Sequence, residues 1–230
     1  MKQTFCSRPN SSLAFALLLL LVLVSGCIPS TQFTSSAGGC PTALVAGEKL
    51  LIGEAFGITP NRSYELYQML DSQVKEAGIQ PAYAVEQDMY LRVQGVKPET
   101  ATDTSNLAKM QQMGYAYYLE LAVGNQAAGL GYASVSAAEK REMQQYNVSP
   151  TQDNTKATVK FNLYSTQAKK LIYTLTTTTE ISPVTLPKQD QANGHRGSTS
   201  VNLSSISMAV DKAFQKGTQK LFEDCKCCRE

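Results

Sequence analysis

The 230-residue sequence contains no tryptophan and only one histidine, His195. A serine-histidine-aspartate arrangement would have to use His195, but this residue lies in the stretch NGHRGSTS, without the G-x-S-x-G elbow that presents a nucleophile. Glu86 and Asp88 are close enough in sequence to act as an acid and a base, yet no neighbouring motif places a substrate between them. We therefore expect a protein that is not an enzyme.

The sequence also lacks an excess of either charge, since 21 lysines and arginines face 19 aspartates and glutamates without any basic run. Binding to nucleic acid depends on a basic patch that neutralises phosphates. Neither G-x-x-x-x-G-K-[ST] nor G-x-G-x-x-G is present, so the glycines of residues 124–131 (GNQAAGLG) are expected to form a loop rather than a phosphate cradle. These absences predict no nucleic-acid partner and no bound cofactor.

Long apolar runs are scarce as well. The uncharged run from Leu13 to Val24 has twelve residues, whereas a membrane-spanning helix needs about 20. Two basic residues precede this run, and the small residues Ser25 and Gly26 follow it. This arrangement is typical of a secretory signal peptide, which we predict at residues 1–26.

Cys27 follows this leader directly, and the four residues from Val24 to Cys27 (VSGC) resemble the lipobox of bacterial lipoproteins. The resemblance implies cleavage before Cys27, a diacylglycerol on its sulfur and usually a third acyl chain on the new amino group. The alternative is an ordinary signal peptide with an accidental cysteine. By similarity to the sorting rule of enteric bacteria, Ile28 in place of an aspartate favours the outer membrane. We expect lipid anchoring there, with the protein facing the periplasm.

Removal of the leader would leave 204 residues (230 minus 26), enough for one domain or at most two. The segment from Ile28 to Gly39 is rich in serine, threonine and glycine and shows no periodicity, which is typical of a flexible tether. We expect three parts: the leader at 1–26, the lipidated cysteine and its tether at 27–40, and an α/β domain with a cysteine-rich tail at 41–230.

Four cysteines remain after Cys27: Cys40 and the tail cysteines Cys225, Cys227 and Cys228. In an oxidising compartment Cys40 can form a disulfide with a tail cysteine, for which Cys225 is the candidate. The tail thiolates are also ligands for copper(I) or zinc, although zinc sites usually show paired clusters. Unpaired thiols are the third alternative. Four cysteines allow three full pairings, and the sequence does not choose among them.

Hydrophobic periodicity predicts the folded part, because apolar residues recur at helical spacing in some segments and at every second position in others. The expected elements are a strand at 48–56, a helix ending near 78, a strand at 79–90, a short helix at 104–113, a strand at 115–123, a hairpin at 157–179 and a helix from 206. The order β-α-β-α-β-β-β-α predicts a single-domain α/β fold with a mixed sheet of about five strands.

Two details complete this expectation. Alternation in the strand at 115–123 should place Tyr115, Tyr117, Leu119, Leu121 and Val123 on one face. The segments 124–154 and 183–200 are expected to be long loops, the first of them with a polar helical piece.

Two stretches carry a resemblance to a known group. Residues 110–124 (MQQMGYAYYLELAVG) and the hairpin at 161–173 (FNLYSTQAKKLIY) resemble segments of the CsgG and LpoB group of periplasmic lipoproteins, and the amino-terminal domain of TolB is similar. The resemblance implies binding or assembly work at the cell envelope, through an envelope protein or the cell wall, rather than catalysis. The alternative is an envelope lipoprotein that binds copper or zinc through its carboxy-terminal cysteines.

Overall fold

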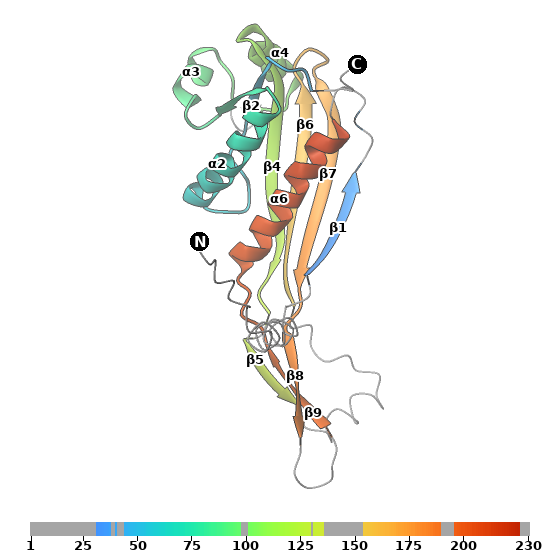
Figure 1. The fold of residues 1–230 in the computed structure, drawn as a ribbon. Coiled ribbons are helices and arrows are strands. Elements are labelled where there is room, and N and C mark those ends of the chain that lie inside the picture. Colours follow the sequence, from blue (N-terminus) through green and yellow to red (C-terminus); the bar gives the residue numbers. More distant parts are fainter. Residues whose placement is uncertain are drawn as a thin grey trace, which may run out of the picture.

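The computed structural model describes residues 31–37, 40, 44–97, 101–129, 131–135, 154–189 and 196–225. Within these ranges one six-stranded sheet carries helices on both faces, and a three-stranded sheet extends beyond one end (Figure 1). The predicted mixed α/β fold is confirmed. None of the helices in these ranges is long and apolar enough to cross a membrane.

The large sheet is mixed because its strands are connected in two ways. It contains β1 (Thr31–Ala37), β2 (Lys49–Ile52), β3 (Gln80–Tyr83), β4 (Tyr115–Ala127), β6 (Thr155–Ser165) and β7 (Lys170–Ile181). Their order across the sheet is β1-β7-β6-β4-β2-β3. The strand β2 is parallel to β3 and β4, to which helical connections lead, whereas β4, β6, β7 and β1 are antiparallel neighbours.

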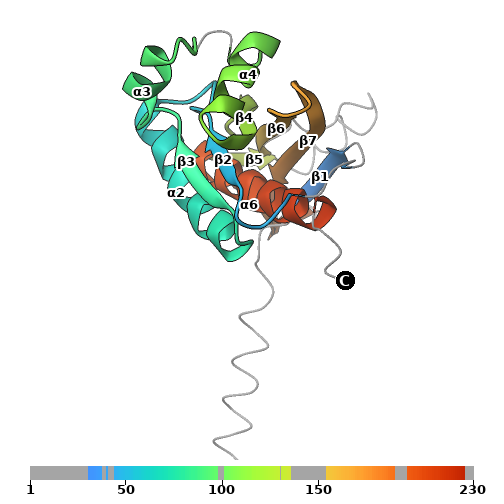
Figure 2. The same ribbon diagram turned by 90° about the horizontal axis from the view of Figure 1, so that it is seen from above.

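The helices divide between the two faces of this sheet. Two long ones, α2 (Pro60–Glu76) and α6 (Ile206–Asp224), cover one face, and α3 (Asp88–Val93) and α4 (Thr104–Gln112) lie on the other side at the parallel end (Figure 2). The hydroxyl oxygens of Thr59 and Ser205 cap α2 and α6, since they accept hydrogen bonds from the backbone nitrogens of Arg62 (3.4 Å) and Met208 (3.1 Å). The main core lies between the long helices and the sheet.

A glycine lets α6 approach the sheet closely. A Cβ atom on Gly217 would lie 2.2 Å from Cε2 of Phe161 and 2.9 Å from Oγ1 of Thr177. The ring of Phe161 also stacks on that of Phe214, with centroids 5.6 Å apart. The hydroxyl of Thr177 at this contact is buried, as is that of Thr179 on the same strand, and neither has a hydrogen-bond partner among the described residues.

The substitution Thr177→Val is therefore expected to raise the free energy of unfolding by about 1 kcal/mol, because valine keeps the shape of threonine and removes an unsatisfied buried hydroxyl. Urea unfolding measures the change. Thr176→Val is the matched control, since Thr176 lies on the opposite face of β7 and is only half-buried. A loss of stability in Thr177→Val would show that the hydroxyl has a partner.

The expected tether is wrong for Thr31–Ala37, which form β1 and pair with residues 175–181 of β7. The hydrogen bonds of this pairing are formed by backbone groups that every residue has. The serine- and threonine-rich composition of the segment therefore did not predict that it pairs with β7. All residues of β1 except the half-buried Thr31 are exposed, which explains why the segment has the polar composition of a tether.

Three other elements also differ from expectation. The predicted strand at 79–90 ends at Tyr83 and is followed by a turn and α3. β4 continues to Ala127, and the two expected loops contain β5 (Tyr132–Val135), β8 (Val184–Gln189) and β9 (Arg196–Val201), which form a sheet in the order β5-β9-β8. A proline such as Pro187 argues against a strand in the segment 183–200, but β8 is an edge strand, where proline is tolerated. The predicted polar helical piece lies outside the described residues.

Candidate functional site

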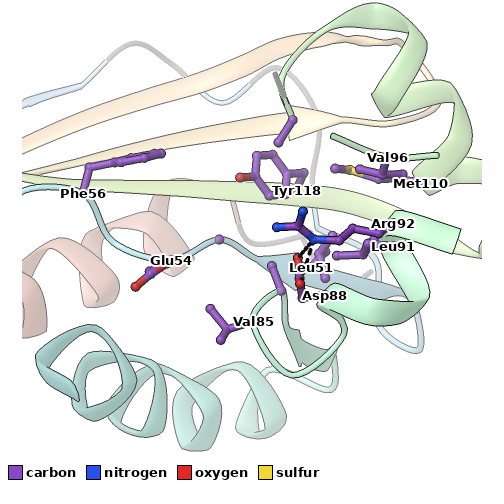
Figure 3. A pocket seen from close by; sticks show the side chains of 13 residues that line it. Leu51, Glu54, Phe56, Val85, Asp88, Leu91, Arg92, Val96, Met110 and Tyr118 are labelled. Carbon is purple, nitrogen blue, oxygen red and sulfur yellow. Dashed lines mark hydrogen bonds and ion pairs between the residues drawn. The ribbon is translucent and has the colours of Figure 1, made fainter. Parts of the chain in front are cut away.

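A cleft of about 660 Å³ opens at the carboxyl ends of β2 and β3. Its walls come from the end of β2 and the loop after it, the turn after β3, the helices α3 and α4 with the segment between them, and the first part of β4 (Figure 3). Ligands of open α/β sheets commonly bind outside the carboxyl ends of parallel strands. The position of the cleft in the topology therefore makes it the leading candidate site within the described residues.

The floor of the cleft is a second, smaller core on the sheet face opposite α2 and α6. Leu51 and Tyr118 project from the sheet, and Leu91 of α3 and Met110 of α4 close over them. Leu50 and Ile52 belong to the main core. Successive side chains of β2 point to opposite faces of the sheet, so this short strand contributes residues to both cores. The apolar run that predicted a buried strand is therefore explained by burial on both faces.

A bulge in β4 decides which tyrosines face the cleft. Lys49 pairs with Tyr115 and Leu50 with Tyr117, so Ala116 is an extra residue on β4. Thr166 holds the bulge, because its hydroxyl lies 2.6 Å from the carbonyl oxygen of Tyr115 and 2.9 Å from that of Ala116. The extra residue moves Tyr115 to the side of the second core, which corrects the expectation that it shares a face with Tyr117.

The hydroxyl of Tyr118 is the most enclosed polar group of the cleft. The side chain is only 6% exposed, and no hydrogen bond joins its hydroxyl to any described residue. Gly53 leaves room for it, since a Cβ atom there would lie 2.6 Å from the hydroxyl oxygen. Burial, followed by the nearby Glu120 and Tyr164, raises the pKa of Tyr118 above its ordinary value. The group therefore remains a protonated donor at physiological pH.

One end of the cleft carries a fixed aromatic ring. The backbone nitrogen of Phe56 donates to the carbonyl of Leu121 (2.9 Å), and the carbonyl of Phe56 accepts from the nitrogen of Val123 (2.8 Å). Gly57 allows this approach, because its φ is +83° and a Cβ atom would lie 2.0 Å from the carbonyl oxygen of Val123. The backbone of Phe56 is thus held in place while its ring is 59% exposed.

The edge of the cleft combines apolar and charged side chains. Val85 lines it and is 48% exposed, and Met89 and Val93, which belong to α3 but do not line the cleft, are 82% and 72% exposed. We call these three residues and Phe56 the apolar rim. Glu54 is exposed at the cleft, and the Nε atom of Arg92 lies 2.8 Å from both carboxylate oxygens of Asp88. Figure 3 shows the side chains of Tyr118 and Arg92 pointing into the space between Phe56 and Met110.

This arrangement fits an apolar group that carries a hydrogen-bond acceptor, since the walls are apolar and the enclosed hydroxyl donates. The cleft was not predicted from the sequence. The available signal was the pair Met89 and Val93, which lie four positions apart across the end of the strand predicted at 79–90 and could have indicated an apolar helical stripe. Of the two carboxylates considered as an acid and a base, Asp88 is paired with Arg92 and Glu86 is exposed.

The structure brings together two of the cysteines singled out in the sequence. Cys40 and Cys225 form a disulfide, with their Cα atoms 5.3 Å apart, and so connect the segment after β1 to the end of α6. Cys27, Cys227, Cys228 and His195 lie outside the described residues. Within the described ranges, no group of three or more histidine, cysteine, aspartate or glutamate side chains is placed to hold a metal ion.

Comparison with known proteins gives no family. No family model and no curated protein matches the chain. Among solved structures, it is similar to a PelC dodecamer from Paraburkholderia phytofirmans, with 13% identity, 85% of this chain and 99% of that chain covered, and a TM-score of 0.44. Lipoprotein GNA1162 from Neisseria meningitidis shows 13% identity, 74% and 96% coverage, and a TM-score of 0.39.

TolB from Acinetobacter baumannii is a further neighbour, with 13% identity, coverage of 61% of this chain and 24% of that chain, and a TM-score of 0.28. GNA1162 is named a lipoprotein, and TolB, whose amino-terminal domain the sequence resembles, is among these neighbours. Because each TM-score is below 0.5, we transfer neither a site nor a function from these proteins.

Proposed function

We propose that this chain is a lipid-anchored cell-envelope protein that binds or assembles a partner without catalysis. Cys27 carries the lipid and holds the protein to the outer membrane on its periplasmic side, as the VSGC motif and Ile28 imply. The partner is an envelope protein that inserts an apolar side chain into the cleft. The proposal depends most on one observation, the exposure of the apolar rim around a preformed cleft.

The rim has the properties of a protein-binding surface. Contiguous exposed apolar residues on a folded domain commonly mark interaction sites, and binding energy concentrates where a partner's anchor fills a pocket. The backbone of Phe56 is already fixed by two hydrogen bonds, so no backbone freedom is lost when a partner covers its side chain. The hydroxyl of Tyr118 at the bottom can donate to a carbonyl of the inserted segment.

The polar groups of the cleft favour binding over catalysis. Tyr118 keeps its proton because its pKa is raised, and Asp88 is engaged by Arg92. Covalent catalysis needs a nucleophile within hydrogen-bond reach of a base, and the described cleft residues include no such pair. These features support a site that recognises its partner by shape and by one hydrogen bond.

The double substitution Phe56→Glu/Val85→Glu is expected to reduce partner capture at least tenfold, because both residues line the cleft and two charges would be buried in the contact. Both side chains are exposed, so the fold should be unaffected. Crosslinking in intact cells, followed by purification and quantitative mass spectrometry, measures capture. Leu186→Glu/Leu203→Glu is the matched control, since Leu186 and Leu203 are 46% and 89% exposed and do not line the cleft.

Equal capture by the wild type, the rim variant and the control would contradict the proposal. Loss of capture in the rim variant alone supports it. Circular dichroism of each purified variant verifies that the three proteins are folded alike.

A further inference from the structure

The two edges of the large sheet differ in their protection against pairing with another strand. At one edge, β3 has only four residues and includes Pro81, which cannot donate a backbone hydrogen bond. At the other edge, β1 has seven residues (TQFTSSA) with no charge, proline or glycine. Natural proteins usually protect edge strands with charges, prolines or bulges. β1 has none of these, and no other described strand pairs with its outer edge.

Within a single chain, few side-chain contacts hold β1. Six of its seven residues are exposed, so β1 is attached mainly by pairing with β7 and by the Cys40–Cys225 disulfide that follows it. Side-chain contacts are sparse: Nζ of Lys212 lies 3.1 Å from the hydroxyl of Thr31, and Nζ of Lys216 lies 5.9 Å from the ring centre of Phe33. The entropy lost by ordering each residue is similar in size to the net gain from one hydrogen bond.

A second strand on the outer edge would change this balance. It would add hydrogen bonds to a backbone that β7 has already ordered, so β1 would gain attachment without a further loss of its own backbone entropy. A second copy of the chain offers a strand of equal length with no charge, and the contact would cover both unprotected edges at once. Antiparallel pairing centred on Thr34 is the arrangement in which all seven residues overlap.

We propose that two copies of this chain associate through the outer edges of their β1 strands, antiparallel and centred on Thr34. The local two-fold axis is perpendicular to the sheet, so the two six-stranded sheets become one, with α2 and α6 of both copies on the same face. Figure 2 shows β1 and α3 at opposite margins of the molecule, and both clefts therefore stay accessible in the pair. The inference stands independently of what the cleft binds.

Introducing a charge at Thr34 tests the pairing, because Thr34 of one copy lies opposite Thr34 of the other in the proposed register. The purified mature protein is expected to sediment as a dimer. Thr34→Lys and Thr34→Glu, each alone, should weaken the dimer about fivefold or more, since like charges then oppose each other across the strands. An equimolar mixture of the two variants should restore the dimer as a mixed pair. Thr34 is exposed, so neither change should disturb the core.

Gln80→Lys on β3 is the matched control, because it places a lysine on the other edge at an exposed position and should leave the dimer intact. A monomeric wild type would overturn the proposal. Dimers that persist unchanged in both Thr34 variants would overturn it as well, as would a mixture that dissociates like its components. A contact elsewhere on the surface would give one of these results.

Discussion

Replacing Cys27 with alanine is expected to move the protein from the membrane fraction to the soluble fraction. Each buried methylene group of an acyl chain contributes about 0.8 kcal/mol, and one chain alone binds only reversibly. Two or three chains on one residue would hold the protein to a bilayer essentially permanently. If these chains are the anchor, loss of the lipid should release the whole population.

Processing complicates this variant, because the resemblance implies that the leader is cut only when the cysteine is present. An uncut leader would keep its twelve-residue apolar run on the protein. A second variant should therefore carry Cys27→Ala and, in place of residues 1–26, a leader that is cut by the general signal peptidase. Fractionation with an antibody, and mass spectrometry of the amino terminus, measure the location and the lipid.

Cys6→Ala is the matched control, since Cys6 lies in the predicted leader and should not affect anchoring. Membrane retention of the variant with the exchanged leader would contradict the lipid assignment. An unmodified Cys27 in the wild type would contradict it directly. Failure of this prediction would leave the cleft and the pairing of β1 to be tested separately.

The double substitution Cys40→Ala/Cys225→Ala is expected to lower the free energy of unfolding by about 3–5 kcal/mol. The disulfide closes a loop with a sequence separation of 185 residues, so its removal releases a large amount of chain entropy in the unfolded state. Cys225 is buried, and its backbone oxygen accepts a hydrogen bond from the nitrogen of Leu44 (3.0 Å). The link thus joins the start of the domain to its last helix.

The tail cysteines require a control of their own, because Cys227 or Cys228 could replace Cys225 in a single variant. Cys227→Ala/Cys228→Ala removes the same number of thiols and should leave the free energy of unfolding within about 0.5 kcal/mol of the wild type. Guanidinium unfolding under non-reducing conditions compares the three proteins. Equal stability of both double variants would show that the disulfide contributes little.

Most of the candidate site could not be predicted from the sequence. The cleft is formed by residues from four separate segments, and its existence depends on how α3 and α4 sit against β4. The side to which Tyr115 and Tyr118 point depends on the bulge at Ala116, which strict alternation does not reveal. The hydroxyl of Tyr118 became notable only when its burial and its neighbours were known.

The sequence by itself determined the mixed α/β class, the order of the main elements and the leader-like amino terminus. Burial of one face gives the residues of a helix or strand a period of 3.6 or 2, and burial of both faces of a strand gives a continuous apolar run. The leader is recognised from its basic residues, apolar run and small residues. Only the tertiary structure decided that Thr31–Ala37 join the sheet, that β5, β8 and β9 form a second one, and that a cleft opens beside α3. These features depend on backbone hydrogen bonds, which every residue type can form, and on contacts between distant segments, which no local pattern records.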